Sequence, residues 1–144
     1  MKTLSINLQH FKDIIENNCV YIDKTELIYN LLMEKEKSFY FLSRPRRFGK
    51  SLLITTLYEI FKGNKELFKE CFIYDKRKFE EYPVILIDFN KVHIKDYGLE
   101  KALCNYLNDL YKSYDLPLNS EKSSTKFDLL IRLLKEKYKK DVVV

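Results

Sequence analysis

The stretch S-R-P-R-R-F-G-K-S, residues 43–51, decides how this chain of 144 residues is interpreted. An apolar run at residues 38–42 comes before it, and a helix-like pattern at residues 52–57 follows it. A strand, a loop that ends in Gly-Lys-Ser and a helix follow one another in this order in a phosphate-binding P-loop. The order of the segments therefore predicts a phosphate-binding turn between a buried strand and a helix.

The residue types in this turn suit the chemistry of a nucleoside triphosphate. Gly49 lets the backbone approach a phosphate closely, and the amides at a helix N-terminus point at the anion. The Lys50 ammonium is placed to reach the β- and γ-phosphates and is the predicted catalytic group, while the Ser51 hydroxyl is a predicted ligand of Mg²⁺. We therefore expect ATP and Mg²⁺ as cofactors. The predicted nucleotide-binding residues are Arg44, Pro45, Arg46, Arg47, Phe48, Gly49, Lys50, Ser51 and Leu52.

The match to the full pattern, G-x-x-x-x-G-K-[ST], is incomplete, because Arg44 stands in place of the first glycine. Two other interpretations stay open. In one, the loop is only a basic surface turn. In the other, it is part of a non-enzymatic module that grips a nucleic-acid backbone or serves as a scaffold. Arg46 and Arg47 suit phosphate oxygens, because a guanidinium is a forked donor, but they equally suit a neighbouring carboxylate.

Two longer segments extend the pattern beyond the loop: Y-I-D-K-T-E-L-I at residues 21–28, and F-L-S-R-P-R-R-F-G-K-S-L-L at residues 41–53. Together with residues 63–68 and 82–89, they resemble the bacterial AAA-ATPase-like family over nearly the whole chain. The resemblance implies an ATP-binding P-loop that accepts Arg at position 44, and ATP hydrolysis by the full-length protein. Members of this family often carry a PD-(D/E)XK nuclease-like domain further along. The resemblance therefore also implies a nuclease-like domain or partner, and contact with nucleic acid through it.

The same resemblance leads to an expectation about the end of the chain. In the family, a helix such as residues 125–140 leads into a strand that closes on the acidic Walker B motif, and here that strand begins at residues 142–144. We therefore expect one domain, residues 1–144, that is the N-terminal part of a longer P-loop domain. The Walker B acids would lie beyond Val144, and the fragment would lack the acids that hydrolysis requires.

Asp88 is a secondary candidate for the metal site. It ends the run V-I-L-I-D at residues 84–88, and an acid at the C-terminal tip of a parallel strand lies where ligands bind in open α/β sheets. Without the family resemblance, Asp88 would be the Walker B acid that holds Mg²⁺ through water. The alternative is an acid that only caps or turns the chain at the end of a strand, and the resemblance places Walker B after Val144.

Asp23, followed by Glu26, resembles a capping box at the start of a helix. The Asp-Lys-Thr motif at residues 23–25 is also distinctive of the family. We therefore interpret the motif first as a helix cap, and a position near the nucleotide is the alternative.

The remaining periodicities alternate between helix and strand. Gly63 is predicted to stop the helix that carries the basic loop. Alternating helices and strands predict an α/β protein, with a parallel sheet of the P-loop NTPase type flanked by helices. The helices are expected at residues 8–17, 23–34, 50–62, 65–71, 99–114 and 124–140, and the strands at 20–22, 38–42, 84–89 and 142–144.

Bulk composition excludes few functions. Hydrophobic residues make up 46% of the chain, which is enough for a substantial core, and the net charge of +5 favours anionic ligands. The three cysteines show no zinc-ligand spacing, and their odd number favours a reducing, cytoplasmic setting over a disulfide framework. No apolar run approaches the length of a membrane span, so no membrane partner is expected.

Overall fold

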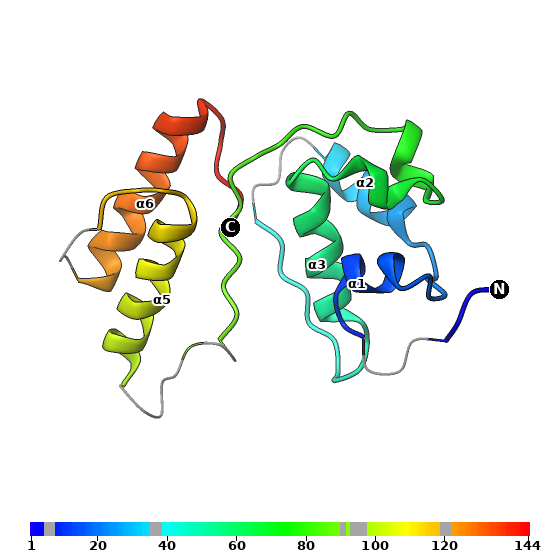
Figure 1. Ribbon diagram of the computed structural model, residues 1–144, viewed down its shortest axis with the longest axis horizontal. Helices are drawn as coiled ribbons and strands as arrows, with labels where there is room; N and C mark the ends of the chain where they lie inside the picture. Colours follow the sequence, from blue (N-terminus) through cyan, green and yellow to red (C-terminus); the bar gives the residue numbers. More distant parts are fainter. Residues whose placement is uncertain (5–7, 35–38, 90–91, 93–97, 119–121) are drawn as a thin grey trace. The chain divides into compact units, whose positions relative to one another are not determined.

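The computed structural model describes residues 1–4, 8–34, 39–89, 92, 98–118 and 122–144. These residues form two compact units, Met1–Glu81 and Tyr82–Val144. Helices are the regular elements of both units in the described part of the chain (Figure 1). None of these helices is long and apolar enough to cross a membrane.

The first unit holds three α-helices and two short 3₁₀ helices. They are α1 (Phe11–Glu16), α2 (Thr25–Met33), α3 (Lys50–Phe61), η1 (Lys65–Phe68) and η2 (Phe72–Asp75). Helices α1 and α3 lie side by side (Figure 1). The backbone amide of Phe11 donates a hydrogen bond to the buried Thr55 hydroxyl at 3.1 Å, which fixes the start of α1 to the middle of α3.

Aromatic and aliphatic side chains from every helix of this unit form its core. Phe11 stacks on Phe68 with ring centroids 4.6 Å apart, and Tyr21 meets the edge of Phe11 at 5.0 Å. Such pairs add about 0.5–1.5 kcal/mol to the stabilisation from burial. The fully buried members of this cluster hold α1, α3 and the two 3₁₀ helices together: Phe11, Ile60, Phe68 and Ile73.

Gly63 ends α3, as the sequence predicts. Its φ of +77° is left-handed, the Asn64 amide bonds to the Glu59 carbonyl at 3.1 Å, and the Gly63 amide bonds to the Ile60 carbonyl at 3.2 Å. These two bonds form a Schellman motif. A Cβ at position 63 would lie 3.3 Å from the Glu81 backbone nitrogen, so both the backbone angle and the available space favour glycine.

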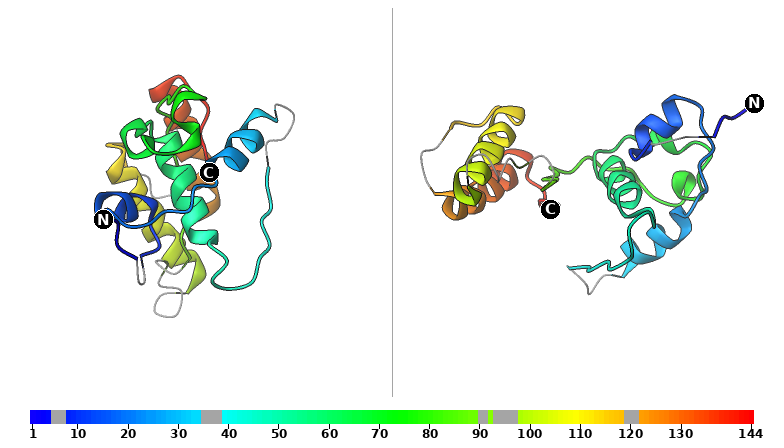
Figure 2. Two further views of the ribbon diagram at one scale, coloured as in Figure 1. Left: turned by 90° about the vertical axis from the view of Figure 1, so that its right-hand side faces the viewer. Right: turned by 90° about the horizontal axis from the view of Figure 1, so that it is seen from below.

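The second unit is built on α5 (Leu99–Ser113) and α6 (Ser123–Tyr138), which lie side by side in Figures 1 and 2. Both helices carry an apolar stripe at helical spacing, as the sequence predicts. The stripes meet in a core with the extended segment that begins this unit, and its buried members are Ile85, Leu107, Tyr111, Tyr114, Leu130 and Leu134.

Tyrosine hydroxyls from α5 bind the backbone of this extended segment. The Tyr114 hydroxyl donates to the Val84 carbonyl at 2.6 Å and accepts from the Val84 amide at 3.0 Å. The Tyr106 hydroxyl donates to the Leu86 carbonyl at 2.6 Å. These hydroxyls take the place that the backbone of a neighbouring strand would have in a sheet.

The predicted parallel sheet is wrong. Within the described residues, strand-like pairing is limited to two isolated parallel bridges, between Thr3 and Cys19 and between Val84 and Val143. Two backbone hydrogen bonds form the second bridge. The Ile85 amide donates to the Val143 carbonyl, and the Val143 amide donates to the carbonyl of residue 83. Two isolated bridges do not make a sheet, so an α/β fold of the P-loop NTPase type is not supported.

The segment predicted to be the buried strand before the loop is exposed. Residues 39–42 are extended without ladder pairing, and Phe39 and Phe41 are 93% and 94% exposed. The first residue of the predicted strand, Ser38, lies outside the described residues. An apolar run forms a strand only when another segment supplies hydrogen-bonding partners along its edge, and that partner is a non-local property.

Candidate basic-loop site

The basic loop, defined here as residues 44–49, connects the extended segment to the first turn of α3. Every residue of the loop is exposed. Helix α3 is fixed to the rest of the unit further along, where the Thr55 hydroxyl accepts a hydrogen bond from the Phe11 amide at 3.1 Å and Ile60 is 1% exposed. The rigid part of α3 therefore presents the loop and the first helical turn to solvent.

Two left-handed residues shape the loop. Arg47 has a φ of +69° and Gly49 a φ of +73°. Gly49 is the N-cap of α3, and its carbonyl accepts the first helical bond from the Leu53 amide at 2.9 Å. A left-handed backbone costs glycine little, whereas it strains arginine. Between these residues, Phe48 is 67% exposed.

The Lys50 ammonium is turned back onto the loop. Its Nζ donates to the Arg44 carbonyl at 2.7 Å and to the Pro45 carbonyl at 2.6 Å. The motif predicted Lys50 as a phosphate contact, but nothing in the sequence indicated these two carbonyl partners. They depend on how the intervening residues turn.

The loop is a concentrated positive patch. Within the described residues, no ion pair is recorded for the guanidinium groups of Arg44, Arg46 and Arg47. No acidic residue occurs between positions 39 and 50. The guanidinium groups are therefore available to an anion in solution, although ordinary salt screens such exposed charges beyond about 10 Å.

The donor set of this site fits a polyphosphate. The first turn of α3 exposes backbone amides that lack intrahelical partners, and the helix dipole favours an anion there. Ser51 in the same turn is exposed, and Leu52 behind it is half-buried against the core. A Cβ added to Gly49 would meet nothing within 4 Å, so the space beside the loop is open. In the described residues, no cluster of three metal-ligating side chains occurs, so a metal here would rely on oxygens of its ligand and on Ser51.

Asp88 belongs to the second unit. It is half-buried, and its backbone amide donates to the Tyr106 hydroxyl at 3.4 Å. Ser51 belongs to the first unit, so the idea that Asp88 and Ser51 bind one Mg²⁺ stays a prediction.

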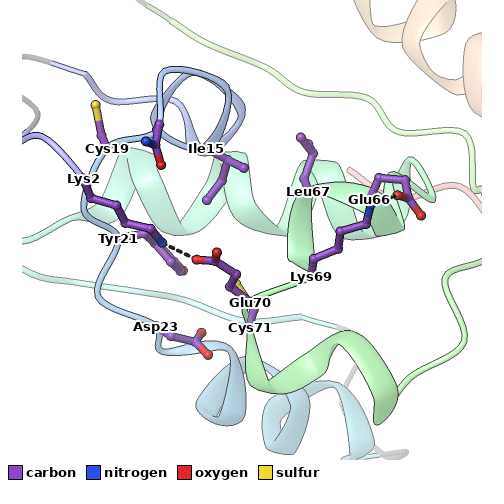
Figure 3. Close-up of a pocket in the computed structure, with 11 residues that line it drawn as sticks. Lys2, Ile15, Cys19, Tyr21, Asp23, Glu66, Leu67, Lys69, Glu70 and Cys71 are labelled. Carbon is purple, nitrogen blue, oxygen red and sulfur yellow. Dashed lines mark hydrogen bonds and ion pairs between the residues drawn. The ribbon is translucent and has the colours of Figure 1, made fainter.

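A cavity of about 240 Å³ in the first unit is the other candidate site (Figure 3). Among its lining residues, Lys2 pairs with Glu70, and Lys69 pairs with Glu66 at 2.6 Å. Asp23 also lines the cavity, whereas none of residues 44–52 is among the lining residues. The cavity is therefore separate from the basic loop, and four of its charged side chains form ion pairs with one another.

Two nucleophilic groups that line this cavity, Cys71 and Tyr21, are held in their neutral forms. Burial raises the pKa of the Cys71 thiol to about 12, with a smaller contribution from the nearby Asp23 charge. Burial also raises the pKa of the Tyr21 hydroxyl to about 12. Neither group ionises near neutral pH, so Cys71 and Tyr21 do not supply an activated thiolate or phenolate there.

A basic loop that ends in Gly-Lys-Ser at the head of a helix defines a candidate phosphate-binding protein. The chain belongs to the AAA-ATPase-like family, because a family model described as a predicted AAA-ATPase matches residues 5–144. The family suspected from the sequence is therefore confirmed. At the level of general class, this description points to nucleotide binding.

One curated relative is similar to the chain over part of its own length. It comes from Azotobacter chroococcum mcd 1, is described as an uncharacterized protein in the vnfD 5′ region, and is 35% identical over 134 residues. The alignment covers 91% of this chain and 26% of the relative, so the chain spans about a quarter of the length of the relative it matches. No solved structure matches the chain.

Proposed function

We propose that the chain binds ATP together with Mg²⁺ through residues 44–52. The observation that carries the proposal is the position of the half-buried Lys50 and the exposed Ser51 in the first turn of α3, in a chain whose family is described as a predicted AAA-ATPase. Backbone amides of that turn would bind phosphate oxygens, and Lys50 would neutralise the β- and γ-phosphates. The arginines of the loop would add charge around the same anion.

Magnesium would supply charge neutralisation between the β- and γ-phosphates and would hold their geometry. On this chain, Ser51 is the proposed ligand, with Asp88 as a secondary candidate. ATP hydrolysis is proposed for the whole protein, where further acidic residues would position the attacking water. A nuclease-like domain or partner, and nucleic acid bound through it, are proposals for that whole protein as well.

The proposal is tested by thermal unfolding with and without Mg-ATP. A ligand that binds only the folded state stabilises it by about 2.7 kcal/mol at a hundredfold excess over its dissociation constant. We expect a rise in Tm for the wild type, no rise for Lys50→Ala, and an unchanged rise for Lys12→Ala. Lys12 is a matched control, because it is an exposed lysine on α1 that pairs with Glu16 at 3.7 Å and lies outside the basic loop. Equal shifts in wild type and Lys50→Ala would refute binding through the loop.

A second candidate function is binding of a nucleic-acid backbone without nucleotide specificity. The observation that favours it is the exposure of Arg44, Arg46 and Arg47, with no ion pair recorded for them in the part of the chain that the structure describes. Binding of an oligonucleotide would then weaken steeply with salt, and Lys50→Ala would reduce the logarithmic salt slope by about one. Under this alternative, Mg-ATP would leave the Tm of the wild type unchanged.

A further inference from the structure

We infer that Lys50 acts as a latch that closes the basic loop on itself in the free chain. A phosphate ligand must then draw the ammonium away from two carbonyl groups before Lys50 can give it more than one N–H donor. This inference rests on the proposed function, and it concerns the regulation of that same site.

The geometry of the latch is defined by two short hydrogen bonds. Nζ of Lys50 lies 2.7 Å from the carbonyl oxygen of Arg44 and 2.6 Å from that of Pro45. These residues precede Lys50 by six and five positions, so the side chain spans the whole loop. The left-handed residues Arg47 and Gly49 turn the chain between the two ends of this span. The latch therefore ties the entrance of the loop to the first residue of α3.

The chemistry of the contacts explains why a phosphate can open the latch. An ammonium group has three donors and no acceptor, and two of these donors are engaged by neutral carbonyl oxygens. A phosphate offers anionic oxygens, which form shorter and stronger hydrogen bonds to an ammonium than neutral acceptors do. Binding therefore exchanges two neutral partners for charged ones. A polyphosphate is favoured over a singly charged anion, because it must compete with the bonds already present.

The latch also restrains the loop before any ligand arrives. Every residue of the loop is exposed, and the structure records no side-chain hydrogen bond from the loop arginines to a described residue. Loops with few contacts open readily and are the preferred sites of proteolytic cleavage. Removing the Lys50 contacts should therefore raise the population of open loop in the free protein.

Limited trypsin digestion of the ligand-free chain tests the latch. The bonds Arg46–Arg47 and Arg47–Phe48 are the reporters, because Pro45 protects the bond after Arg44. We expect Lys50→Met to speed cleavage at both reporters by about fivefold or more, since slow proteolysis follows the population of the open form. Lys50→Arg, which keeps the charge and the donors, should stay close to the wild type.

Two controls separate the latch from general loosening. The bond after the exposed Lys78, which follows η2, should be cut at the same rate in all variants. Lys12→Met should leave the reporters unchanged. Reporter rates within twofold of the wild type in Lys50→Met, or an equal rise after Lys78, would overturn the inference. If Lys50→Met lacks a cooperative thermal transition, Lys50→Gln, which keeps one amide donor group, replaces it under the same criteria.

The result is independent of the Mg-ATP experiment. If Lys50→Met speeds cleavage at the reporter bonds but Mg-ATP does not shift the Tm of the wild type, the latch is supported and the proposed ligand is refuted. If Mg-ATP shifts the Tm in a way that depends on Lys50 but the cleavage rates at the reporter bonds are unchanged, ATP binding is supported and the latch is refuted.

Discussion

The carboxylate of Asp23 accepts a hydrogen bond from the backbone amide of Phe72 at 2.7 Å, and this contact joins two segments 49 residues apart. The other carboxylate oxygen accepts from the Thr25 amide at 2.8 Å. The buried Thr25 hydroxyl accepts from the Ile73 amide at 3.2 Å. Two side chains of the Asp-Lys-Thr motif therefore bind the first turn of η2 and the first turn of α2 at once.

Asp23 precedes Lys24, the N-cap of α2, so the predicted helix cap is instead a side-chain bridge between α2 and η2. Asp23→Ala is expected to lower the free energy of unfolding by about 1–3 kcal/mol, because each of its two hydrogen bonds contributes about 0.5–1.5 kcal/mol. The substitution leaves the amides of Thr25 and Phe72 without the partners they have in the folded chain. Urea unfolding followed by circular dichroism measures the change. Asp75→Ala is the control, because Asp75 is an exposed aspartate of η2 and no contact of its carboxylate with a described residue is recorded. An equal effect of both substitutions would show that the Asp23 contacts contribute nothing specific.

Substitution of Phe68 should destabilise the protein strongly, whereas substitution of Phe41 should hardly change its stability. Phe41 is 94% exposed and Phe68 is fully buried against Phe11. Phe68→Ala is expected to cost about 3–5 kcal/mol, because it removes buried surface and leaves a cavity. Phe41→Ser is expected to change the free energy of unfolding by less than about 0.5 kcal/mol. A loss of several kcal/mol for Phe41→Ser in urea unfolding would show that the segment at residues 39–42 is buried in solution.

The Phe41 segment illustrates what the sequence predicts and what it does not. Helices α3 and α5 were predicted within two residues at either end, because the apolar spacing and stop signals of a helix lie within the helix itself. Phe39–Leu42 has the composition of a buried strand, yet its burial depends on a distant partner. The four-residue helix η2 was not predicted, since its amides are bound by Asp23 and Thr25 from far along the chain.

The candidate site likewise has features that the sequence predicts and features that it does not. The motif alone predicts Ser51 in the first helical turn, because its place follows from the order of a loop and a helix. The left-handed backbone of Gly49 was not predicted. The contacts of Lys50 with the Arg44 and Pro45 carbonyls follow from the turn of the loop, which the residue types do not specify. The same limit explains why the contacts of the Tyr114 hydroxyl with the Val84 backbone had no signal in the sequence.

Alkaline pH should destabilise the first unit through Cys71. Burial raises the pKa of this thiol to about 12 in the folded chain, whereas an unfolded cysteine ionises near about 8.5. Unfolding therefore releases a proton above about pH 8.5, and stability falls as pH rises through the window up to about 12. The raised pKa of Tyr21 acts in the same direction, from about pH 10 upward.

The expected result is a Tm that falls between about pH 8.5 and 10 in the wild type and falls less steeply in Cys71→Ala. Cys104→Ala is the control, because Cys104 lies on α5 in the second unit and is only half-buried. Tm profiles for the three proteins, at constant ionic strength, measure the difference. Parallel profiles for the wild type and Cys71→Ala would contradict the assignment of the effect to this thiol.

Tyr114→Phe should destabilise the second unit by about 1–3 kcal/mol, the cost of leaving buried polar groups without hydrogen bonds. The Tyr114 hydroxyl is the partner of both the amide and the carbonyl of Val84, at 3.0 and 2.6 Å, and both contacts are buried. Phenylalanine keeps the ring and therefore its edge contact with Tyr138, whose centroid lies 6.0 Å away. The substitution thus removes the hydroxyl contacts while the packing of the ring is retained.

Tyr138→Phe is the matched control, since no hydrogen bond of the Tyr138 hydroxyl to a described residue is recorded and its ring belongs to the same pair. Hydrogen exchange of the Val84 and Ile85 amides provides a second readout. The Ile85 amide bonds to Val143 at 2.7 Å, on the edge of the segment that Tyr114 does not bind. Faster exchange at Val84 than at Ile85 in Tyr114→Phe would show that the hydroxyl holds one edge of the segment. Unchanged exchange at both amides, with an unchanged free energy of unfolding, would show that the extended backbone is held without it.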